Sequence, residues 1–355
     1  MANSVYLHIP FCNNICSYCD FCKFYKNDEI INKYLDSLEN EIDNDFLGEK
    51  LNTLYIGGGT PSCLNNNQLN KLFDITSRFI FNDNYEFTIE CNIEDIDEEI
   101  LELFKNNRVN RLSIGVQSFI KKNLDFLDRN KNIDIISRIN LAKKYFDNIN
   151  IDLIYALKNQ SIKDLEKDID IFLSLDLPHI SCYSLIIEPH TKISNIKPIN
   201  DKLDYDMFKL IDSKLKDYNH YEISNYSKKG YESKHNLTYW NNEEYYGFGL
   251  SASSYLNNIR YTNYRNLTKY NEKIYKKEKE ILSLEDKMKY EYILKFRLKD
   301  GINIKDFNKK YNCNILDNKI IKELINEDKL LIENDNIIVN KKYIYVINEI
   351  LVKLI

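Results

Sequence analysis

Short apolar runs alternate with amphipathic stretches through the first 190 residues of the chain. Six runs rich in β-branched and aromatic residues predict strands, at residues 4–9, 53–56, 87–91, 111–115, 149–154 and 179–187. Between them, apolar residues recur at three- and four-residue spacing, which predicts helices near residues 30–46, 66–80, 95–107, 120–145 and 161–175. Strands that alternate with helices indicate parallel β/α units, and six units are fewer than the eight of a closed barrel.

The pattern changes twice beyond residue 190. Residues 191–280 are less regular and rich in tyrosine, so we expect a connector and a segment that covers a ligand site. Helix-like stretches near 285–298, 304–311 and 317–327 then precede an apolar run with a turn at residues 334–336, which predicts a hairpin. The sequence therefore predicts an α/β fold in three parts: a six-unit domain over 1–190, a covering region over 191–280, and a small helical, winged-helix-like domain over 281–355.

Composition narrows the function classes. The chain has 355 residues, 43% of them hydrophobic, and a formal net charge of −5, so it can fill a core and is not expected to be disordered. Winged helices can bind DNA, but residues 301–355 hold nine Lys and eight Asp or Glu, so no basic stripe points to nucleic acid. No apolar run reaches the roughly 20 residues of a membrane helix. The first residues carry no secretory signal pattern, so we expect a cytoplasmic protein.

Four of the eight cysteines fall within eleven positions, at Cys12, Cys16, Cys19 and Cys22. A chain of this length in a reducing compartment does not need a disulfide framework, so the cluster indicates a metal site. Structural zinc usually takes two ligand pairs a dozen or more residues apart, and no second pair follows at that spacing. The first three cysteines instead place three thiolates on one tight loop, as iron–sulfur clusters require. An iron–sulfur cluster is favoured over zinc, and Cys22 is either a fourth ligand or, as we favour, a bystander.

The segment Tyr6-Leu-His-Ile-Pro-Phe-Cys12-Asn-Asn-Ile-Cys16-Ser-Tyr18-Cys19-Asp-Phe resembles the cluster loop of radical S-adenosylmethionine (SAM) enzymes. Together with Asn110-Arg-Leu-Ser-Ile-Gly-Val-Gln-Ser-Phe119 and Asp152-Leu-Ile-Tyr155, it is similar to the oxygen-independent coproporphyrinogen III oxidase-like family. The resemblance implies a partial (β/α)6 barrel and a [4Fe–4S] cluster on Cys12, Cys16 and Cys19. In that family the open iron binds SAM, and an electron from the reduced cluster cleaves SAM to a 5′-deoxyadenosyl radical.

The scarce glycines gather just after a predicted strand, where parallel β/α folds place their chemistry. Gly57-Gly58-Gly59-Thr60-Pro61 uses three of the nine glycines. Adjacent glycines either let a backbone approach a ligand or form a tight strand-to-helix turn, and the resemblance favours contact with SAM. The resemblance also implies that residues at matching motif positions contribute to the SAM site: Tyr6, Tyr18, Gly58, Gly59, Thr60, Glu90, Gln117, Arg129 and Asp152.

Four of these polar residues have expected positions in the fold. Glu90 is expected at the end of the third strand, Gln117 in the loop after the fourth, and Arg129 on the helix that follows. Asp152 lies inside an apolar run, and a carboxylate in a strand, taken alone, usually faces solvent or pairs locally. Carboxylates can accept hydrogen bonds from ribose hydroxyls, and Gln and Arg can bind carboxylate oxygens, so the set suits SAM chemically.

The hexapeptide His235-Asn-Leu-Thr-Tyr239-Trp240 contains the only tryptophan of the chain and one of its five histidines. In isolation we would interpret His235 as a hydrogen-bonded core histidine. An imidazole flanked by aromatic rings can also be an axial haem ligand. The hexapeptide resembles a His-Asn-x-x-Tyr-Trp motif of haem-handling members of the family, so His235 is the candidate haem ligand.

Two branches of the family compete for the function. The decarboxylase branch makes protoporphyrinogen and has a further cysteine two residues after the third ligand, where this chain has Phe21. A haem-chaperone branch keeps the cluster and SAM and shares the sequence Cys19-Asp20-Phe21. We therefore expect a haem chaperone whose cargo is haem and whose partners are client haemoproteins and a reductant protein. Coproporphyrinogen III decarboxylation is the alternative, and a zinc-stabilised binding module or a haem-degrading methyltransferase are weaker ones.

Overall fold

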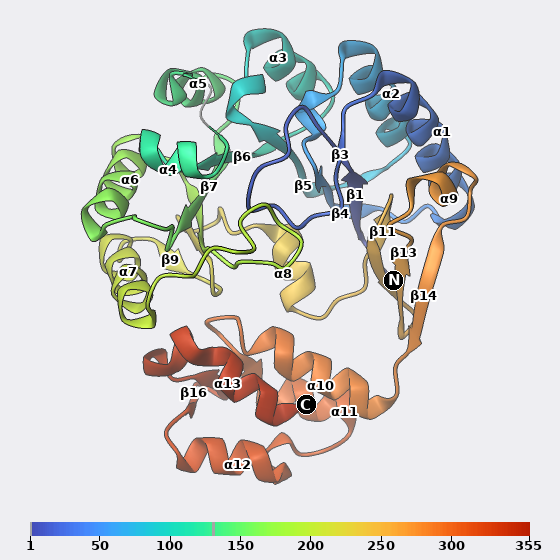
Figure 1. Ribbon diagram of the computed structural model, residues 1–355. Coiled ribbons are helices and arrows are strands. Elements are labelled where there is room, and N and C mark those ends of the chain that lie inside the picture. Colours follow the sequence, from blue (N-terminus) through green and yellow to red (C-terminus); the bar gives the residue numbers. More distant parts are fainter. Residues whose placement is uncertain (1, 130–131) are drawn as a thin grey trace.

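The computed structural model describes residues 2–129 and 132–355 (Figure 1). Nine strands form one sheet in the order β11-β1-β4-β5-β6-β7-β8-β10-β9. Its centre consists of six consecutive parallel strands: β1 Ser4–Ile9, β4 Leu51–Gly58, β5 Phe81–Asn92, β6 Arg111–Gln117, β7 Asn148–Tyr155 and β8 His179–Ser184. The six predicted strands and their parallel arrangement are confirmed, although β5 begins earlier and β8 ends sooner than expected.

Helices that follow the strands cover the outer face of the sheet (Figure 1). They are α1 Asp28–Asp45, α2 Asn66–Ser77, α3 Glu98–Asn106, α4 Lys121–Phe126, α5 Ile135–Ala142, α6 Ile162–Ser174 and α7 Asp201–Lys214. The single helix expected over 120–145 is wrong, because the described residues there form two short helices. The chain leaves the first of them at Asp128, whose φ of 56° is left-handed. Residues 130–131 of that expected helix lie outside the described residues.

Segments from residues 191–280 extend the same sheet at both edges. β10 Asn225–Ser227 pairs antiparallel with β8, and β9 Asn219–His220 pairs with β10. β11 Tyr246–Phe248 pairs parallel with β1 at the opposite edge, and α8 Lys234–Trp240 contacts β4. The other elements of this region are β12 Ser253–Leu256, β13 Ile259–Asn263, α9 Leu267–Asn271 and β14 Lys276–Ile281. β9, β10 and β11 have only two or three residues and therefore too little periodicity to be predicted from sequence.

The last part of the chain has a hydrophobic core of its own, with Phe296, Phe307 and Ile337 among its buried members. Its elements are α10 Leu284–Lys295, β15 Ile302–Asn303, α11 Ile304–Tyr311, α12 Lys319–Asn326, β16 Leu330–Glu333, β17 Asn336–Val339 and α13 Ile347–Leu351. Short 3-10 helices occur at Pro61–Cys63, Ile93–Asp95, Ile315–Asp317, Lys341–Val346 and Val352–Leu354. The predicted hairpin is confirmed: Asn334 and Asp335 both have positive φ, as a two-residue hairpin turn requires. This unit lies beneath the large sheet in Figure 1.

Strand alternation gives the large sheet two different faces. In β6, Leu112, Ile114 and Val116 belong to the main hydrophobic core. The alternate positions of β6 are Arg111, Ser113, Gly115 and Gln117, and all four line a cavity on the other side of the sheet. The helices therefore cover an apolar face, and the inner face is free to carry polar chemistry. Among the described residues, no helix is both long and apolar enough to cross a membrane.

Candidate cofactor site

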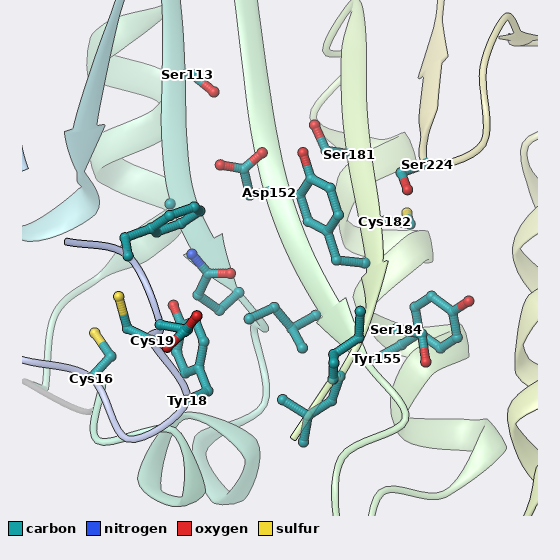
Figure 2. A pocket seen from close by; sticks show the side chains of 18 of the residues that line it. Cys16, Tyr18, Cys19, Ser113, Asp152, Tyr155, Ser181, Cys182, Ser184 and Ser224 are labelled. Carbon is teal, nitrogen blue, oxygen red and sulfur yellow. The ribbon is translucent and has the colours of Figure 1, made fainter. Parts of the chain in front are cut away.

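A cavity of about 1100 Å³ lies against the polar inner face of the sheet. Figure 2 shows Cys16, Tyr18 and Cys19 on one loop, with Asp152 and Ser181 on strands across from them. The predicted site residues that line this cavity are Cys12, Cys16, Tyr18, Cys19, Gly58, Gly59, Thr60, Glu90, Gln117, Arg129 and Asp152. Tyr6 and His235 are not among its lining residues. The fold therefore brings together eleven of the thirteen predicted residues from six separate segments.

The three cysteines lie on a loop that is closed at its base. β2 Phe11–Cys12 pairs with β3 Phe24–Tyr25, and the residues between them form the loop. Its far side is held by Ser17, whose hydroxyl donates to the Phe126 carbonyl at 3.1 Å. Cys12 is buried, whereas Cys16 and Cys19 are half-buried. In the described part of the chain, no three His, Cys, Asp or Glu side chains gather as ligands of one metal ion would.

The glycine turn after β4 is crowded by the protein itself. A Cβ on Gly57 would lie 2.7 Å from the Glu90 carboxyl carbon, and one on Gly58 would lie 2.6 Å from the His8 ring. A Cβ on Gly59 would lie 2.7 Å from the Phe11 carbonyl oxygen and 3.0 Å from the Cys12 sulfur. Gly58 also has a φ of +117°, which a residue with a side chain adopts only with strain. The turn thus needs glycine for packing, whatever ligand its Gly58 and Gly59 backbone contacts.

Two enclosed carboxyl groups face the cavity from neighbouring parts of the sheet. Glu90 accepts hydrogen bonds from the Tyr55 hydroxyl at 2.8 Å and the Gly58 amide at 3.0 Å. Desolvation still raises its pKa to about 7. Asp152 accepts from the Asn150 amide at 2.8 Å, and burial raises its pKa as well. Asp152 thus faces the interior of the molecule, not solvent as its sequence context alone would suggest.

Arg129 comes three residues after the end of α4, so its expected position on a helix is wrong. The guanidinium donates from Nη1 to Asn92 Oδ1 at 2.6 Å and from Nη2 to the Tyr18 hydroxyl at 3.4 Å. Its Nε has no hydrogen-bond partner among the described residues. Gln117 is the last residue of β6, not a loop residue, and its φ of 69° coincides with a register shift between β6 and β7. The Glu94 carboxylate lies 4.0 Å from Nη1, so this buried cation already has one anionic neighbour, and its remaining donor suits a further anionic group.

Tyr6 and Cys22 line a second, smaller cavity of about 310 Å³. The Tyr6 hydroxyl bonds the Nδ1 of His8 at 2.9 Å, and the Cys22 thiol points to the Arg265 carbonyl at 4.0 Å. The placement of Cys22 outside the large cavity agrees with a bystander thiol.

His235 has the environment of a structural histidine. It is 1% exposed, and its Nδ1 and Nε2 bond the hydroxyls of Thr53 and Tyr239, each at 2.7 Å. Its ring stacks on Tyr55 at 5.1 Å between centroids. Desolvation lowers its pKa to about 3, so the ring is neutral at physiological pH. Coordination of haem iron would require breaking one of these two buried hydrogen bonds.

Several polar residues of the cavity wall were not predicted from sequence. They include Tyr55, Asn92, Arg111, Asn150 and Ser181. Four of them lie between two residues of the main hydrophobic core, and Arg111 directly precedes a core residue, Leu112. This period-two alternation was present in the sequence, but only a curved sheet with an enclosed inner face makes such positions a site.

The fold and the three-cysteine loop define the class of protein. Residues 6–172 match the sequence profile of the Radical SAM superfamily. The solved structure of coproporphyrinogen III oxidase HemN from Escherichia coli, a radical SAM enzyme, superposes with a TM-score of 0.86 over 99% of this chain and 89% of that chain. At 22% identity this likeness establishes a shared fold.

Curated relatives narrow the class to one family. Heme chaperone HemW of Lactococcus lactis is 41% identical over 346 residues, which are 93% of this chain and 90% of the relative. Heme chaperone HemW of Bacillus subtilis is 37% identical over 353 residues, 93% of each chain. The Escherichia coli protein of the same name is 34% identical over 265 residues, 70% of this chain and 69% of that one. The chain belongs to the HemW family of radical SAM proteins.

Proposed function

We propose that this protein holds a [4Fe–4S] cluster on Cys12, Cys16 and Cys19, binds SAM beside it, and carries haem to client haemoproteins. The observation that carries the proposal is that three thiols of one loop line the same cavity as Glu90 and Arg129. The relatives named heme chaperone supply the choice of cargo.

The residues present fit the two cofactors. Three thiolates are the ligands that iron–sulfur clusters take, and three leave one iron open. Arg129, with an unused Nε donor, can bind a carboxylate, and Glu90 and Asp152 can accept from ribose hydroxyls or an amino group. When bound, the cluster and SAM supply one-electron chemistry. The protein's own part is to hold the ligand groups apart from bulk water and to orient them.

The cavity also has room for a larger cargo. Drug-sized ligands occupy cavities of about 300–1,000 Å³, and this cavity exceeds that range. The cavity wall also contains apolar residues of two separate parts of the chain, Ile186 after β8 and Ile344 of the C-terminal unit among them. Arg265 and Arg297 line the same cavity and can meet carboxylates. These features suit an apolar macrocycle that carries propionate groups.

Coordination of haem iron by His235 requires its hydrogen bond to Thr53 or to Tyr239 to open. A cytoplasmic setting, a reductant protein and client haemoproteins complete the proposal. The C-terminal unit has a structural or covering role in it, because its charges are balanced and suggest no nucleic-acid partner.

The test uses full-length protein reconstituted anaerobically with iron and sulfide. One sample receives haem and is scored for a stable Soret spectrum after desalting. A parallel sample receives SAM, a strong reductant and coproporphyrinogen III, and its products are weighed by mass spectrometry. Haem uptake without decarboxylation supports a chaperone, whereas loss of one or two carboxyl groups would make the protein a decarboxylase. Cys12→Ala serves as the matched variant without a complete cluster.

A further inference from the structure

Consecutive hydrogen bonds connect Arg129 to the cluster ligand Cys12. Arg129 Nη1 donates to Asn92 Oδ1 at 2.6 Å, and Asn92 Nδ2 donates to Thr60 Oγ1 at 3.1 Å. The Thr60 hydroxyl then donates to the Cys12 sulfur at 3.6 Å, within the range for a sulfur acceptor. Thr60 and Cys12 are both buried. These hydrogen bonds thus connect the cluster loop to three other segments, the turn after β4, the end of β5 and the segment after α4.

Arg129 fixes which group donates and which accepts in each of these hydrogen bonds. A guanidinium can only donate, so the Asn92 oxygen must face Arg129 and its NH2 group must face Thr60. The Thr60 oxygen therefore accepts from Asn92, and its hydrogen is left to point at Cys12. Asn92 itself is held in place because its backbone amide donates to the Ser62 hydroxyl at 3.2 Å. A cysteine that ligates a cluster is a thiolate without a proton, so Cys12 can only accept the bond from Thr60.

Gly115 has no side chain, and the space beside it is occupied by the side chains of Arg129 and Asn92. A Cβ at this position would lie 3.0 Å from Arg129 Nη2 and 3.7 Å from Asn92 Oδ1. The φ of Gly115 is not left-handed, so its backbone conformation does not require glycine. A Cβ here would also lie 3.0 Å from Gln117 Nε2, so the close approach of Arg129 and Gln117 is the structural reason for a glycine at this position.

We propose that this hydrogen-bond chain sets the reduction potential of the cluster. Thr60 is the donor to the Cys12 thiolate, and Asn92 is a positioning residue that keeps the hydroxyl pointed at the sulfur. A reduced cluster carries one more negative charge than an oxidised one, so a hydrogen bond to its sulfur ligand stabilises the reduced form more. The chain therefore raises the potential and makes the cluster easier to reduce. The inference rests on the cluster part of the proposed function and is independent of haem.

The test is a redox titration of the reconstituted full-length protein, followed by electron paramagnetic resonance, with neither SAM nor haem present. Thr60→Val keeps the shape and removes the donor. We expect the ratio of reduced to oxidised cluster at a fixed potential to fall about tenfold, which is ~59 mV for a one-electron couple. Thr60→Ser keeps the hydroxyl and should keep the wild-type potential. Thr238→Val is the matched control, because Thr238 is buried and hydrogen-bonded to Ser4 but does not line the cavity.

Asn92→Leu separates the positioning role from a general disturbance. It should lower the potential in the same direction as Thr60→Val, and the double variant should shift no further than Thr60→Val alone. A wild-type potential in Thr60→Val would overturn the proposal, and additive shifts would remove Asn92 from it. If Thr60→Val takes up no cluster, the test rests on Asn92→Leu: a lowered reduction potential supports the proposal and a wild-type potential overturns it. Wild-type protein that takes up no cluster would instead refute the proposed function together with this inference.

Discussion

Replacing His235 by phenylalanine is expected to destabilise the protein more at neutral pH than in mild acid. The ring in the wild type is 1% exposed and bonds two buried hydroxyls, those of Thr53 and Tyr239. Phenylalanine is larger than histidine and cannot form hydrogen bonds, so it crowds the site and leaves both hydroxyls without their imidazole partner. Each unsatisfied buried group costs about 1–3 kcal/mol, so the loss of two partners should lower the free energy of unfolding by about 2–6 kcal/mol near pH 7.5.

The acid side of the prediction follows from the pKa of His235. Burial lowers it to about 3 in the folded protein, against about 6.5 in the unfolded chain. Above pH 6.5 the ring is neutral in both states, so its contribution does not change with pH. Below pH 6.5 the unfolded chain binds a proton that the folded protein does not, and stability is lost at ~1.36 kcal/mol per unit. At pH 5 the wild type has lost about 2 kcal/mol of stability in this way, and the phenylalanine variant loses none because its side chain does not titrate.

The assay is anaerobic urea unfolding of both proteins at pH 7.5 and pH 5. The difference in free energy of unfolding should narrow by about 2 kcal/mol at the lower pH. Other buried groups with shifted pKa values, such as Glu41 and Glu90, are present in both proteins and cancel in the difference. If the difference in free energy of unfolding between the two proteins is the same at both pH values, the conclusion that His235 is buried and neutral is wrong. A variant of wild-type stability that no longer retains haem would restore His235 as the haem ligand.

Three further predictions concern the cofactor site. Cys12→Ala should leave reconstituted protein colourless, whereas Cys22→Ala should keep the cluster absorbance because Cys22 lines the smaller cavity; a colourless Cys22 variant would contradict the ligand assignment. Gly59→Ala should reduce iron and sulfide content severalfold, since its Cβ would lie 2.7 Å from the Phe11 oxygen; full occupancy would show that the turn can shift. Glu90→Gln should weaken SAM binding by calorimetry about tenfold or more, the loss of a charge-assisted hydrogen bond, and unchanged affinity would remove Glu90 from the SAM site.

The six parallel strands and the three-cysteine loop could be predicted because both are local patterns. A strand such as β6 shows its alternation of apolar and polar residues within seven positions. Cys12, Cys16 and Cys19 are close in sequence, so their meeting on one loop depends little on the rest of the fold. The hairpin at Asn334 and Asp335 was predictable for the same reason, since its turn chemistry lies in two residues.

The orientation of the site residues was decided only by the tertiary structure. Asp152 faces an enclosed cavity and Tyr6 faces a different one, although both lie on strands of one sheet. His235 forms a hydrogen bond with Thr53, 182 residues away in the sequence, and no spacing of residues in the sequence predicts that contact. β11 reaches β1 from across most of the chain. Sequence determined which elements form and which chemistry is available, because those depend on near neighbours; burial, register and long-range pairing decided which side chains share a cavity.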